Sequence, residues 1–551
     1  MKDKLYGHYN GDFGQSPELI ALENMRKRID NLYTWTPINE IAETDDGNIT
    51  AALASADCNI GLKSGDYYID RSIEVKAALF FANGARLHIP DDVTITCKSS
   101  VTGGRCPIFI GGNVKLNGNS IVFPEWFGAV ALNDGDDLVD SSNGFNKAIS
   151  SISQKGGCVS LVSGNFKVIG DGEKYGIKDN CYYISNPVIV SHSHIHIGCD
   201  NGKAVIFANG NTVFSSNGSF TENVNIHDIM IYNNGSATQC VPMLIIENFA
   251  RSSVCRLRIV KAQRGINMWQ TTNMLCEDIE ISPFITDDYV CETIGIEVNS
   301  TPHPVRDISP NASARFSRCL FNFVGTKYPD RCYAIICDGA DQRDLFFDNC
   351  EVALGNGLWF VNGANYAFDV HIHHWIHDQV SDFSIKIEGS KQGLFNINGG
   401  YISGGANATA GIIAFGGGST VAVNNVEFQG DTTVAEFRAI LVENARSLSS
   451  VGCSFLNCYN CVYVVDASAS IMNNAIITDQ NRFTSSNKVM GDAITIVSGG
   501  ATIIGNIFRH FQQNFQHPFA IKTECKASVI GNVYNGLDVL LHPDCFNSGN
   551  Y

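Results

Sequence analysis

A loose repeat from residue 222 onward constrains the fold more than any other feature of this 551-residue sequence. Short stretches recur in which apolar residues alternate on both sides of a polar turn, as in VNIHDIMI, LFFDNCEV and IIGNIF. The turn residues run from Asp228 to Gly531, a span of 303 residues in eleven steps, or about 27.5 residues per step. A unit of this length buries its apolar side only against its neighbours, which indicates a stacked repeat.

The pattern around each turn residue predicts the kind of repeat. Taking positions −4, −2, +1 and +3 as inward, 41 of 48 are apolar, whereas the overall hydrophobic content of 44% would give about 21. A further short strand follows most repeats, as in YAIICDG and CVYVVDA. Three short strands per coil predict an all-β fold, a right-handed parallel β-helix. The turn residues are Asp228, Arg256, Asp278, Arg318, Asn349, His374, Gly399, Asn425, Gly452, Asn474, Gly505 and Gly531.

Composition excludes several classes of partner. Lys and Arg number 38 against 55 Asp and Glu, a formal net charge of −17, whereas a nucleic-acid or anionic-membrane surface needs the opposite balance. No run approaches the roughly 18 apolar residues of a membrane span, and MKDKLYGHYNGDFG lacks the hydrophobic segment of a secretory signal. We therefore expect no nucleic acid, no membrane insertion, and synthesis in a cytoplasm where the 19 cysteines stay reduced and pack in the core.

The sequence before the repeat predicts a segmented N-terminal part. Residues 16–33 read as a capped helix in which Leu22, Met25, Ile29 and Leu32 follow a 3-4-3 spacing, either a short coiled-coil seam or a helix packed on its own domain. Two later segments, 49–95 and 144–197, share the order helix, strand and Gly-containing turn, and a turn-rich junction at 124–137 separates them. The expected division is 1–40 adapter with a short helix, 41–130 head domain, 131–535 β-helix and 536–551 tail.

With this motif order and repeat, the chain resembles the phage tailspike depolymerases of the pectate-lyase-like superfamily. The resemblance is carried by PEWFGAV and DGDD, then FNKAISSI, GGCVSLVSGNF and the long irregular coil array. It covers about residues 120–535 in architecture and 124–170 in motif. It implies a homotrimer in the virion tail, joined to the phage tail or another tail protein through its N-terminus, that cleaves capsule or O-antigen polysaccharide during host adsorption. Only about seventeen residues follow Tyr534, so the large C-terminal domain of many relatives is expected to be absent or very small.

The repeat register suggests where the chemistry lies. Glycoside hydrolysis needs two carboxylates about 5–5.5 Å apart for retention or 6.5–9.5 Å for inversion, and neighbouring coils lie about 4.8 Å apart. Asp344 and Asp369 occupy position −5 on neighbouring coils, and Glu351 occupies the outward position +2. We take these three as the candidate catalytic set; for each, the alternative is a solvated surface residue.

Other outward side chains near these acids suit sugar binding. Arg315 and His371 share position −3 and would orient the sugar or an acidic substituent. Tyr401 and Trp359 would serve as stacking platforms, although the register of Trp359 also permits a core position.

Two histidine clusters invite a metal interpretation, which we do not favour. His192, His194 and His196 alternate along one predicted strand, and HIHHWIHD carries four more histidines, but neither has a carboxylate at ligand spacing. The pair Cys458 and Cys461 lacks a second ligand pair, so core packing is the simpler interpretation. We expect neither a metal nor a cofactor.

Apolar residues at an outward position of the last coils predict a subunit interface. Ile476, Ile507 and Val533 all fall at +2, where exposure to water is costly and burial between subunits is natural. A homotrimer with contacts along these coils follows as a hypothesis.

Three functions remain open on the sequence. The leading one is endo-glycosidic hydrolysis of a bacterial surface polysaccharide. A polysaccharide lyase, acting on a uronic acid with a His or Tyr base and Arg315 as charge neutraliser, is the nearest alternative. A non-catalytic receptor-binding fibre is the third. No phosphate-binding loop, nucleophile elbow or HExxH motif supports nucleotide, esterase or zinc-protease chemistry.

Overall fold

The computed structural model describes residues 35–38, 47–117, 120–133, 135–152, 155–169, 174–233, 240–282, 292–299, 312–339, 343–361, 367–389, 392–405, 407–430, 436–478, 490–510 and 517–551. The predicted helix at 16–33 lies outside the described residues. Contacts divide the chain into two compact units, Met1–Asn117 and Gly118–Tyr551, so the second unit begins before the expected boundary at residue 130. No helix of the described residues is long and apolar enough to cross a membrane.

Within its described residues, the first unit contains one short α-helix and parallel strands. The helix α2 (Thr50–Ser55) precedes β2, as the sequence pattern predicted for the segment from residue 49. Every strand pairing in this unit is parallel, and Ile60, Leu79 and Val101 are aligned on three successive strands. The strands are β1 (Thr36–Pro37), β2 (Ile60–Leu62), β3 (Gly65–Tyr68), β4 (Ile73–Val75), β5 (Leu79–Phe81), β6 (Ala85–Cys97), β7 (Val101–Gly103) and β8 (Phe109–Lys115).

The second unit starts with a covered end. The PEWF motif forms the short helix η2 (Pro124–Phe127), in which Trp126 is buried, and α3 (Ser142–Ser151) packs against it. Phe145 of α3 lies edge-on to Tyr182, whose hydroxyl donates to the buried Glu125 carboxylate at 2.6 Å. These contacts bury the motif residues at the start of the stack. The first strands are β9 (Ser120–Val122), β10 (Gly157–Ser160), the hairpin β11 (Asn165–Ile169) and β12 (Lys174–Asp179), β13 (Cys181–Ile184), β14 (Val188–Val190), β15 (Ile195–Gly198), β16 (Ala204–Ala208) and β18 (Thr221–Glu222).

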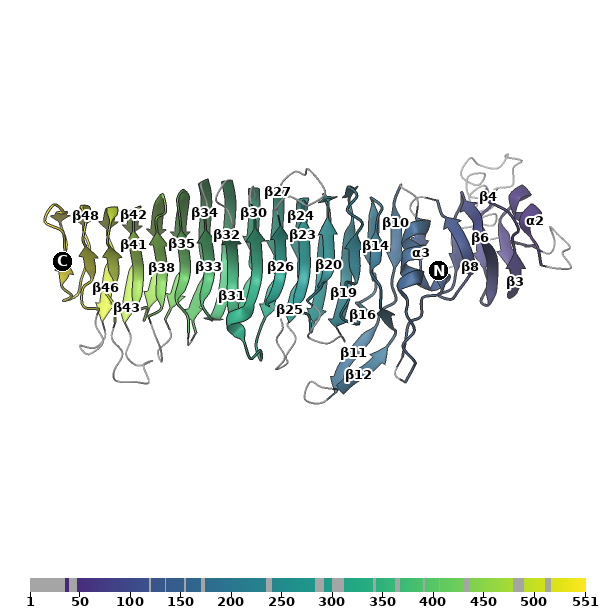
Figure 1. The fold of residues 1–551 in the computed structure, drawn as a ribbon, viewed down its shortest axis with the longest axis horizontal. Helices are drawn as coiled ribbons and strands as arrows, with labels where there is room; N and C mark the ends of the chain where they lie inside the picture. Colours follow the sequence, from purple (N-terminus) through teal and green to yellow (C-terminus); the bar gives the residue numbers. More distant parts are fainter. Residues whose placement is uncertain are drawn as a thin grey trace, which may run out of the picture. The chain divides into compact units, whose positions relative to one another are not determined.

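The remainder of the second unit is the predicted right-handed parallel β-helix, whose strands stack side by side in Figure 1. We call the strand segments before each turn residue face 1, those after it face 2, and the third strands face 3. Faces 1 and 2 comprise β19 (Asn225–Asn233), β22 (Ser253–Val260), β24 (Thr272–Glu277), β25 (Glu280–Ser282), β27 (Ala312–Ser317), β28 (Leu320–Asn322), β30 (Arg343–Asp348), the start of β31 (Glu351–Val361), β32 (Ala367–Val380), β34 (Gln392–Gly404), β36 (Ser419–Asn424), β37 (Glu427–Gln429), β39 (Ser447–Val451), β40 (Ser454–Leu456), β42 (Ala467–Met472), β43 (Ala475–Thr478), β45 (Gly499–Ile504), β46 (Ile507–His510), β48 (Ala527–Ile530) and β50 (Phe546–Ser548).

Face 3 carries the third strand of each coil, again in parallel register. For example, Ile336, Trp359 and Lys386 are aligned on three successive coils. Its strands are β17 (Phe214–Ser216), β20 (Pro242–Glu247), β23 (Arg264–Trp269), β26 (Thr293–Asn299), β29 (Cys332–Asp338), the end of β31, β33 (Phe383–Glu388), β35 (Ala410–Phe415), β38 (Arg438–Glu443), β41 (Asn460–Val465), β44 (Ile494–Ile496), β47 (Ile521–Thr523) and β49 (Val539–Leu540). The short strand β21 (Phe249–Ala250) lies between β20 and β22 along the chain.

The predicted turn residues form a left-handed corner between faces 1 and 2. Eleven of the twelve have a positive φ, for instance 54° at Asp278 and 52° at His374. Asn474 is the exception, because Asn473 takes the corner with φ 55°. This one-residue shift turns Ile476 inward, with 1% exposure, so its predicted outward position is wrong. Ile507 and Val533 are outward as predicted, with 38% and 40% exposure.

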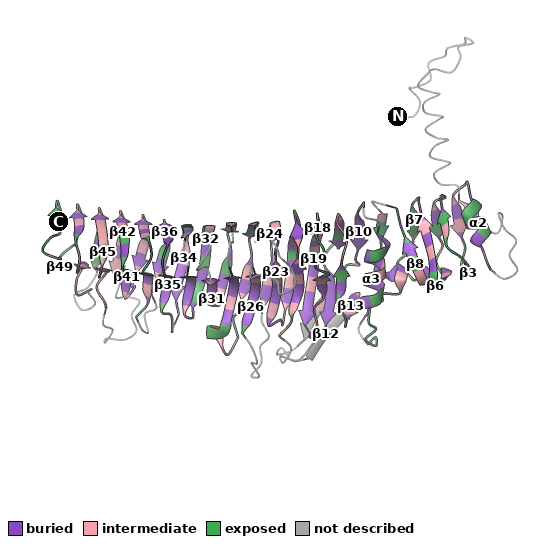
Figure 2. Cartoon of the chain, turned by 45° about the horizontal axis from the view of Figure 1, so that its top comes forward, coloured by how far each residue is buried: buried purple, intermediate pink, exposed green. Residues whose placement is uncertain are grey.

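Buried residues, drawn in purple in Figure 2, recur along the stack, and most of them are apolar. Most free cysteines among the described residues are buried there, including Cys458 and Cys461, which confirms their packing role. Cys240 is disulfide-bonded, which corrects the expectation of reduced thiols at that position.

A ladder of buried asparagines replaces apolar residues in the last coils. Asn474 donates to Asn506, Asn506 to Asn532 and Asn532 to Asn550, each through both its backbone and its side-chain amide. Strands β49 and β50 extend the pairing into residues 536–551, the segment expected to be a tail.

Candidate functional site

Two of the three predicted catalytic acids lie on neighbouring coils of face 1. Leu345 pairs with Val370, and Asp344 and Asp369 directly precede these two residues. Asp344 is exposed and Asp369 is half-buried, so both side chains lie at the surface and not in the core. Asp344 has a left-handed backbone, φ 53°, and accepts a hydrogen bond from the Ser313 hydroxyl at 3.3 Å.

Asp369 is paired with a histidine on its own strand. Its Oδ1 lies 3.2 Å from Nε2 of His371, two residues along β32. The His371 ring stacks on Phe346 of the preceding coil, with centroids 5.0 Å apart and planes at 10°. One coil further, the Arg315 guanidinium lies 5.3 Å from the Phe346 centroid. Arg315, Asp344, Phe346, Asp369 and His371 form what we call the face-1 patch.

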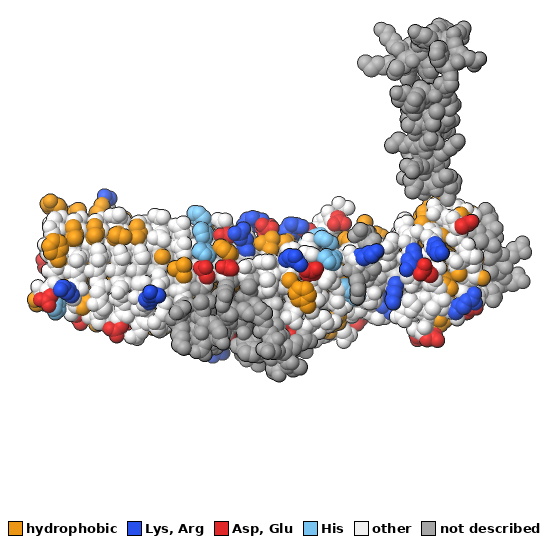
Figure 3. Space-filling model, turned by 90° about the horizontal axis from the view of Figure 1, so that it is seen from above, with side chains coloured by type: hydrophobic (Ala, Val, Ile, Leu, Met, Phe, Trp, Pro, Cys, Tyr) orange, Lys and Arg blue, Asp and Glu red, His pale blue; other side chains and the backbone are white. Residues whose placement is uncertain are grey.

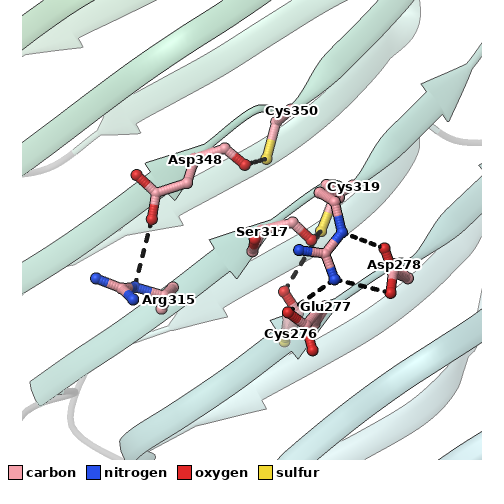
Figure 4. Close-up of polar contacts among 9 residues, drawn as sticks. Cys276, Glu277, Asp278, Arg315, Ser317, Cys319, Asp348 and Cys350 are labelled. Atoms are coloured by element: carbon pink, nitrogen blue, oxygen red, sulfur yellow. Dashed lines mark hydrogen bonds and ion pairs between the residues drawn. The ribbon is translucent and has the colours of Figure 1, made fainter.

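The face-1 patch lies in a wider band of charged and histidine side chains, which Figure 3 shows on the upper side of the second unit. Arg315 also pairs with Asp348 at 3.3 Å. Nearby, Arg318 binds both oxygens of Asp278 and also pairs with Glu277. Figure 4 labels these two acids, together with Arg315 and Asp348. Hydrogen bonding to Arg318 lowers the pKa of Asp278, so this corner carboxylate stays charged.

The third predicted acid, Glu351, lies on a different face. It is exposed and pairs in register with Leu320 and Ile376 on face 2, round the corner from Asp344. The register places it two coils from Glu280, as predicted. The structure therefore places Asp344 and Asp369 on neighbouring coils of face 1 and Glu351 on face 2.

The two predicted stacking residues also lie away from the face-1 patch. Tyr401 is on face 2, next to Ile376, and its hydroxyl donates to Gln429 at 3.0 Å. Trp359 is on face 3, where its indole N–H donates to Glu388 at 3.1 Å and the Lys386 ammonium lies 5.0 Å from its ring. Each aromatic residue is therefore positioned for a different face of the β-helix.

The histidine clusters do not form a metal site within the described residues. His194 has φ 60° and precedes β15, which begins at Ile195, so the three histidines do not lie on one regular strand; His194 and His196 nevertheless line the same surface hollow. In the second cluster His377 points inward and accepts from or donates to the Ser384 hydroxyl at 2.9 Å. Burial lowers the pKa of His377 to about 3, which keeps it neutral near neutral pH.

A pocket of about 670 Å³ lies where face 2 meets face 3, and sequence reasoning missed it. Its polar lining includes Lys327, Asp330, Asp378, Tyr401, Ser403 and Gln429. The short helix η3 (Pro329–Arg331) forms one wall and carries Asp330, and β32 and β34 contribute Asp378 and Tyr401 to the other. The interruption KYPDR between two strands was the available sequence signal.

Comparison with known proteins shows which solved structures have a similar fold. No family model matches the chain, and no curated protein matches it. Among solved structures it is similar to a mutant tailspike protein of E. coli bacteriophage HK620 in complex with pentasaccharide, with 13% identity, a TM-score of 0.50, and coverage of 72% of this chain and 74% of that chain.

Other solved structures match the chain at lower scores. The catalytic unit of an alpha-1,3-glucanase from Streptomyces thermodiastaticus has 12% identity and a TM-score of 0.36, covering 78% of this chain and 68% of that chain. The A-module of Azotobacter vinelandii mannuronan C-5 epimerase has 12% identity and a TM-score of 0.41, covering 78% and 98%. The chain is thus a tailspike-like right-handed parallel β-helix protein in fold, in agreement with the resemblance in its sequence.

Proposed function

We propose that this protein is a tailspike-like depolymerase that binds a bacterial surface polysaccharide and cleaves it within the chain by glycosidic hydrolysis. The observation that carries the proposal is the pair Asp344 and Asp369, two surface carboxylates on neighbouring coils, with Nε2 of His371 lying 3.2 Å from Oδ1 of Asp369. The similar tailspike structure contains a pentasaccharide, which supports a saccharide as the ligand class.

The arrangement suits a two-carboxylate mechanism. Neighbouring coils lie about 4.8 Å apart, close to the roughly 5–5.5 Å that a retaining hydrolase needs. One carboxylic acid protonates the glycosidic oxygen as its bond to the anomeric carbon breaks, and the other carboxylate bonds to that carbon. Water, which gives a proton to the first carboxylate, then displaces the second carboxylate and completes the hydrolysis. His371 orients Asp369, while Arg315 and Phe346 provide a cationic and apolar surface for the flanking sugar. Glu351 is given no step, because it lies on face 2.

One specific observation favours lyase chemistry as the second candidate. A histidine held by a carboxylate, with an arginine on the same surface, also suits removal of the proton next to a uronate carboxylate. A hydrolase releases products without ultraviolet absorbance, whereas a lyase releases unsaturated uronides that absorb. A non-catalytic fibre would leave the polymer intact.

We also propose that the protein assembles as a homotrimer in the virion tail through an apolar strip on its last coils. Val451, Met472, Ile504 and Ile530 are aligned at position −1, and Ile507 and Val533 are exposed on the adjoining face 2. Figure 3 shows this orange row along the same side as the histidines. An apolar row this regular is natural between subunits.

The experiment is depolymerisation of purified capsular and O-antigen polysaccharides, followed by chromatographic sizing, ultraviolet absorbance and reducing-end assay. Hydrolysis predicts smaller polymer and new reducing ends without absorbance. Binding without any change in polymer size would favour the receptor-binding fibre instead. The same measurement on Asp344→Asn and Asp369→Asn assigns the cleavage to the face-1 patch.

A further inference from the structure

The pocket between faces 2 and 3 has the size and chemistry of a ligand site of its own. Its volume of about 670 Å³ falls within the 300–1,000 Å³ typical of small-molecule sites. It lies on a different side of the β-helix from Asp344 and Asp369, because it is bounded by the end of face 2 and by η3. The proposed cleavage mechanism uses none of its residues.

The polar groups of the pocket are held in fixed positions. The Ser403 hydroxyl donates to Asp378 Oδ1 at 3.0 Å and accepts the Gln379 backbone N–H at 3.0 Å. The Tyr401 hydroxyl donates to Gln429 Oε1 at 3.0 Å. A carboxylate offers about four acceptor positions, and the bond from Ser403 occupies one of them at Asp378. Fixed acceptors of this kind suit the hydroxyl groups of a sugar.

The charged side chains of the pocket determine which kinds of sugar can bind there. Asp330 and Asp378 are two acids in one pocket, with Lys327 as the cation among its lining side chains. Burial raises the pKa of the nearby Tyr333 to about 12, and the charges of Glu292, Asp382 and Asp330 raise it too, so the surroundings are negative. A uronic acid or a phosphorylated sugar would be repelled there, whereas an uncharged sugar would not.

Face 3 carries an aromatic group close in sequence to the pocket residue Asp330. Asp330 lies three residues before Tyr333, whose ring is 5.3 Å from that of Trp359 and 6.2 Å from that of Phe383. Trp359 is half-buried with its indole N–H fixed by Glu388. Aromatic faces of this kind pack against the apolar side of a sugar ring.

We propose that this pocket is a second saccharide-binding site, which takes an uncharged, hydroxyl-rich sugar unit such as a neutral hexose or N-acetylhexosamine and holds the polymer without cleaving it. The proposal rests on the proposed function only in taking a polysaccharide as the ligand. It assigns Asp378 and Tyr401 to sugar recognition and leaves cleavage to the face-1 patch.

The test is saturation-transfer NMR of the full chain with a panel of neutral hexoses, N-acetylhexosamines and hexuronic acids. We expect binding of at least one uncharged sugar, no binding of the uronic acids at this site, and affinity at least tenfold weaker in Asp378→Asn and Tyr401→Phe. Both variants keep the shape of the side chain. Asp538→Asn and Tyr463→Phe, which change the same groups outside the pocket, serve as matched controls and should bind as the unaltered protein does.

The outcomes separate this proposal from the proposed function. Asp369→Asn should abolish cleavage of polysaccharide and leave the uncharged sugar bound at unchanged affinity. If no polysaccharide is cleaved but the pocket variants still weaken sugar binding, the second site stands and the hydrolase fails. Absence of binding by any uncharged sugar, equal binding in the pocket variants, or a preference for uronic acids overturns the second site.

Discussion

Oδ1 of Asp369 lies 3.2 Å from Nε2 of His371, and the ring of that histidine stacks on Phe346 of the neighbouring coil. This contact places an acid and a base close together on face 1 of the β-helix. The stack ties their position to the coil before, so the geometry depends on correct winding of coils that are distant in sequence.

Substituting His371 by alanine should lower kcat by about 100-fold, because Asp369 loses the group that orients it. His374→Asn is the matched control, since His374 is an exposed corner residue with φ 52° and asparagine tolerates that conformation. The measurement is the initial rate of reducing-end release. Equal rates for the two variants would remove His371 from the mechanism.

The buried His377 should make stability fall at acidic pH. Its pKa is lowered to about 3 in the folded state, against about 6.5 when unfolded, so unfolding takes up a proton below pH 6.5. Stability is therefore full above pH 6.5 and is lost as pH falls towards 3, by about 2 kcal/mol between pH 7.5 and 5.0.

Urea unfolding at the two pH values checks this dependence. A His377→Gln variant should lose most of the difference between them, whatever its absolute stability, and His374→Asn should retain it. A difference of the same size in His377→Gln would show that another group causes the effect.

The asparagine ladder should stabilise the last coils. Asn506 accepts from Asn474 and donates to Asn532 and to the Ile471 carbonyl, all of it buried. Asn506→Ala leaves these partners unsatisfied and should lower the free energy of unfolding by about 2 kcal/mol or more. Ser470→Ala, an outward change one coil away, should stay within about 0.5 kcal/mol, and denaturant titration distinguishes the two.

The apolar strip predicts a charge-sensitive oligomer. Ile507→Glu and Val533→Glu each place a charge on the proposed interface and should shift the sedimenting species from trimer to monomer at micromolar concentration. Exposed Lys526→Glu adds the same side chain outside the strip and should leave the trimer intact. A monomer in the unaltered protein would refute the interface outright.

The sequence predicted the winding well because the corner has a strict backbone requirement. A left-handed residue between two strands favours glycine, asparagine and aspartate, and the flanking inward positions must be apolar. Where two asparagines adjoin, at Asn473 and Asn474, either meets the requirement, and the choice of Asn474 misplaced Ile476.

The candidate site was harder to predict, because outward positions carry no such constraint. The register correctly set Asp344 beside Asp369 and Arg315 in line with His371, since stacking alone fixes those relations. The register did not show that Glu351 lies on face 2, and so on a different surface from Asp344 and Asp369. The pocket at Asp378 depends on the path of the segment Lys327–Arg331, which no periodic pattern specifies.

The most direct test of the central claim is the size distribution of a bacterial surface polysaccharide after incubation with the protein. Polymer mass should fall with the unaltered chain, and the rate of that fall should be at least 100-fold lower for Asp344→Asn combined with Asp369→Asn. Unchanged mass for every polysaccharide that the protein binds, or undiminished cleavage by the double variant, would contradict the central claim.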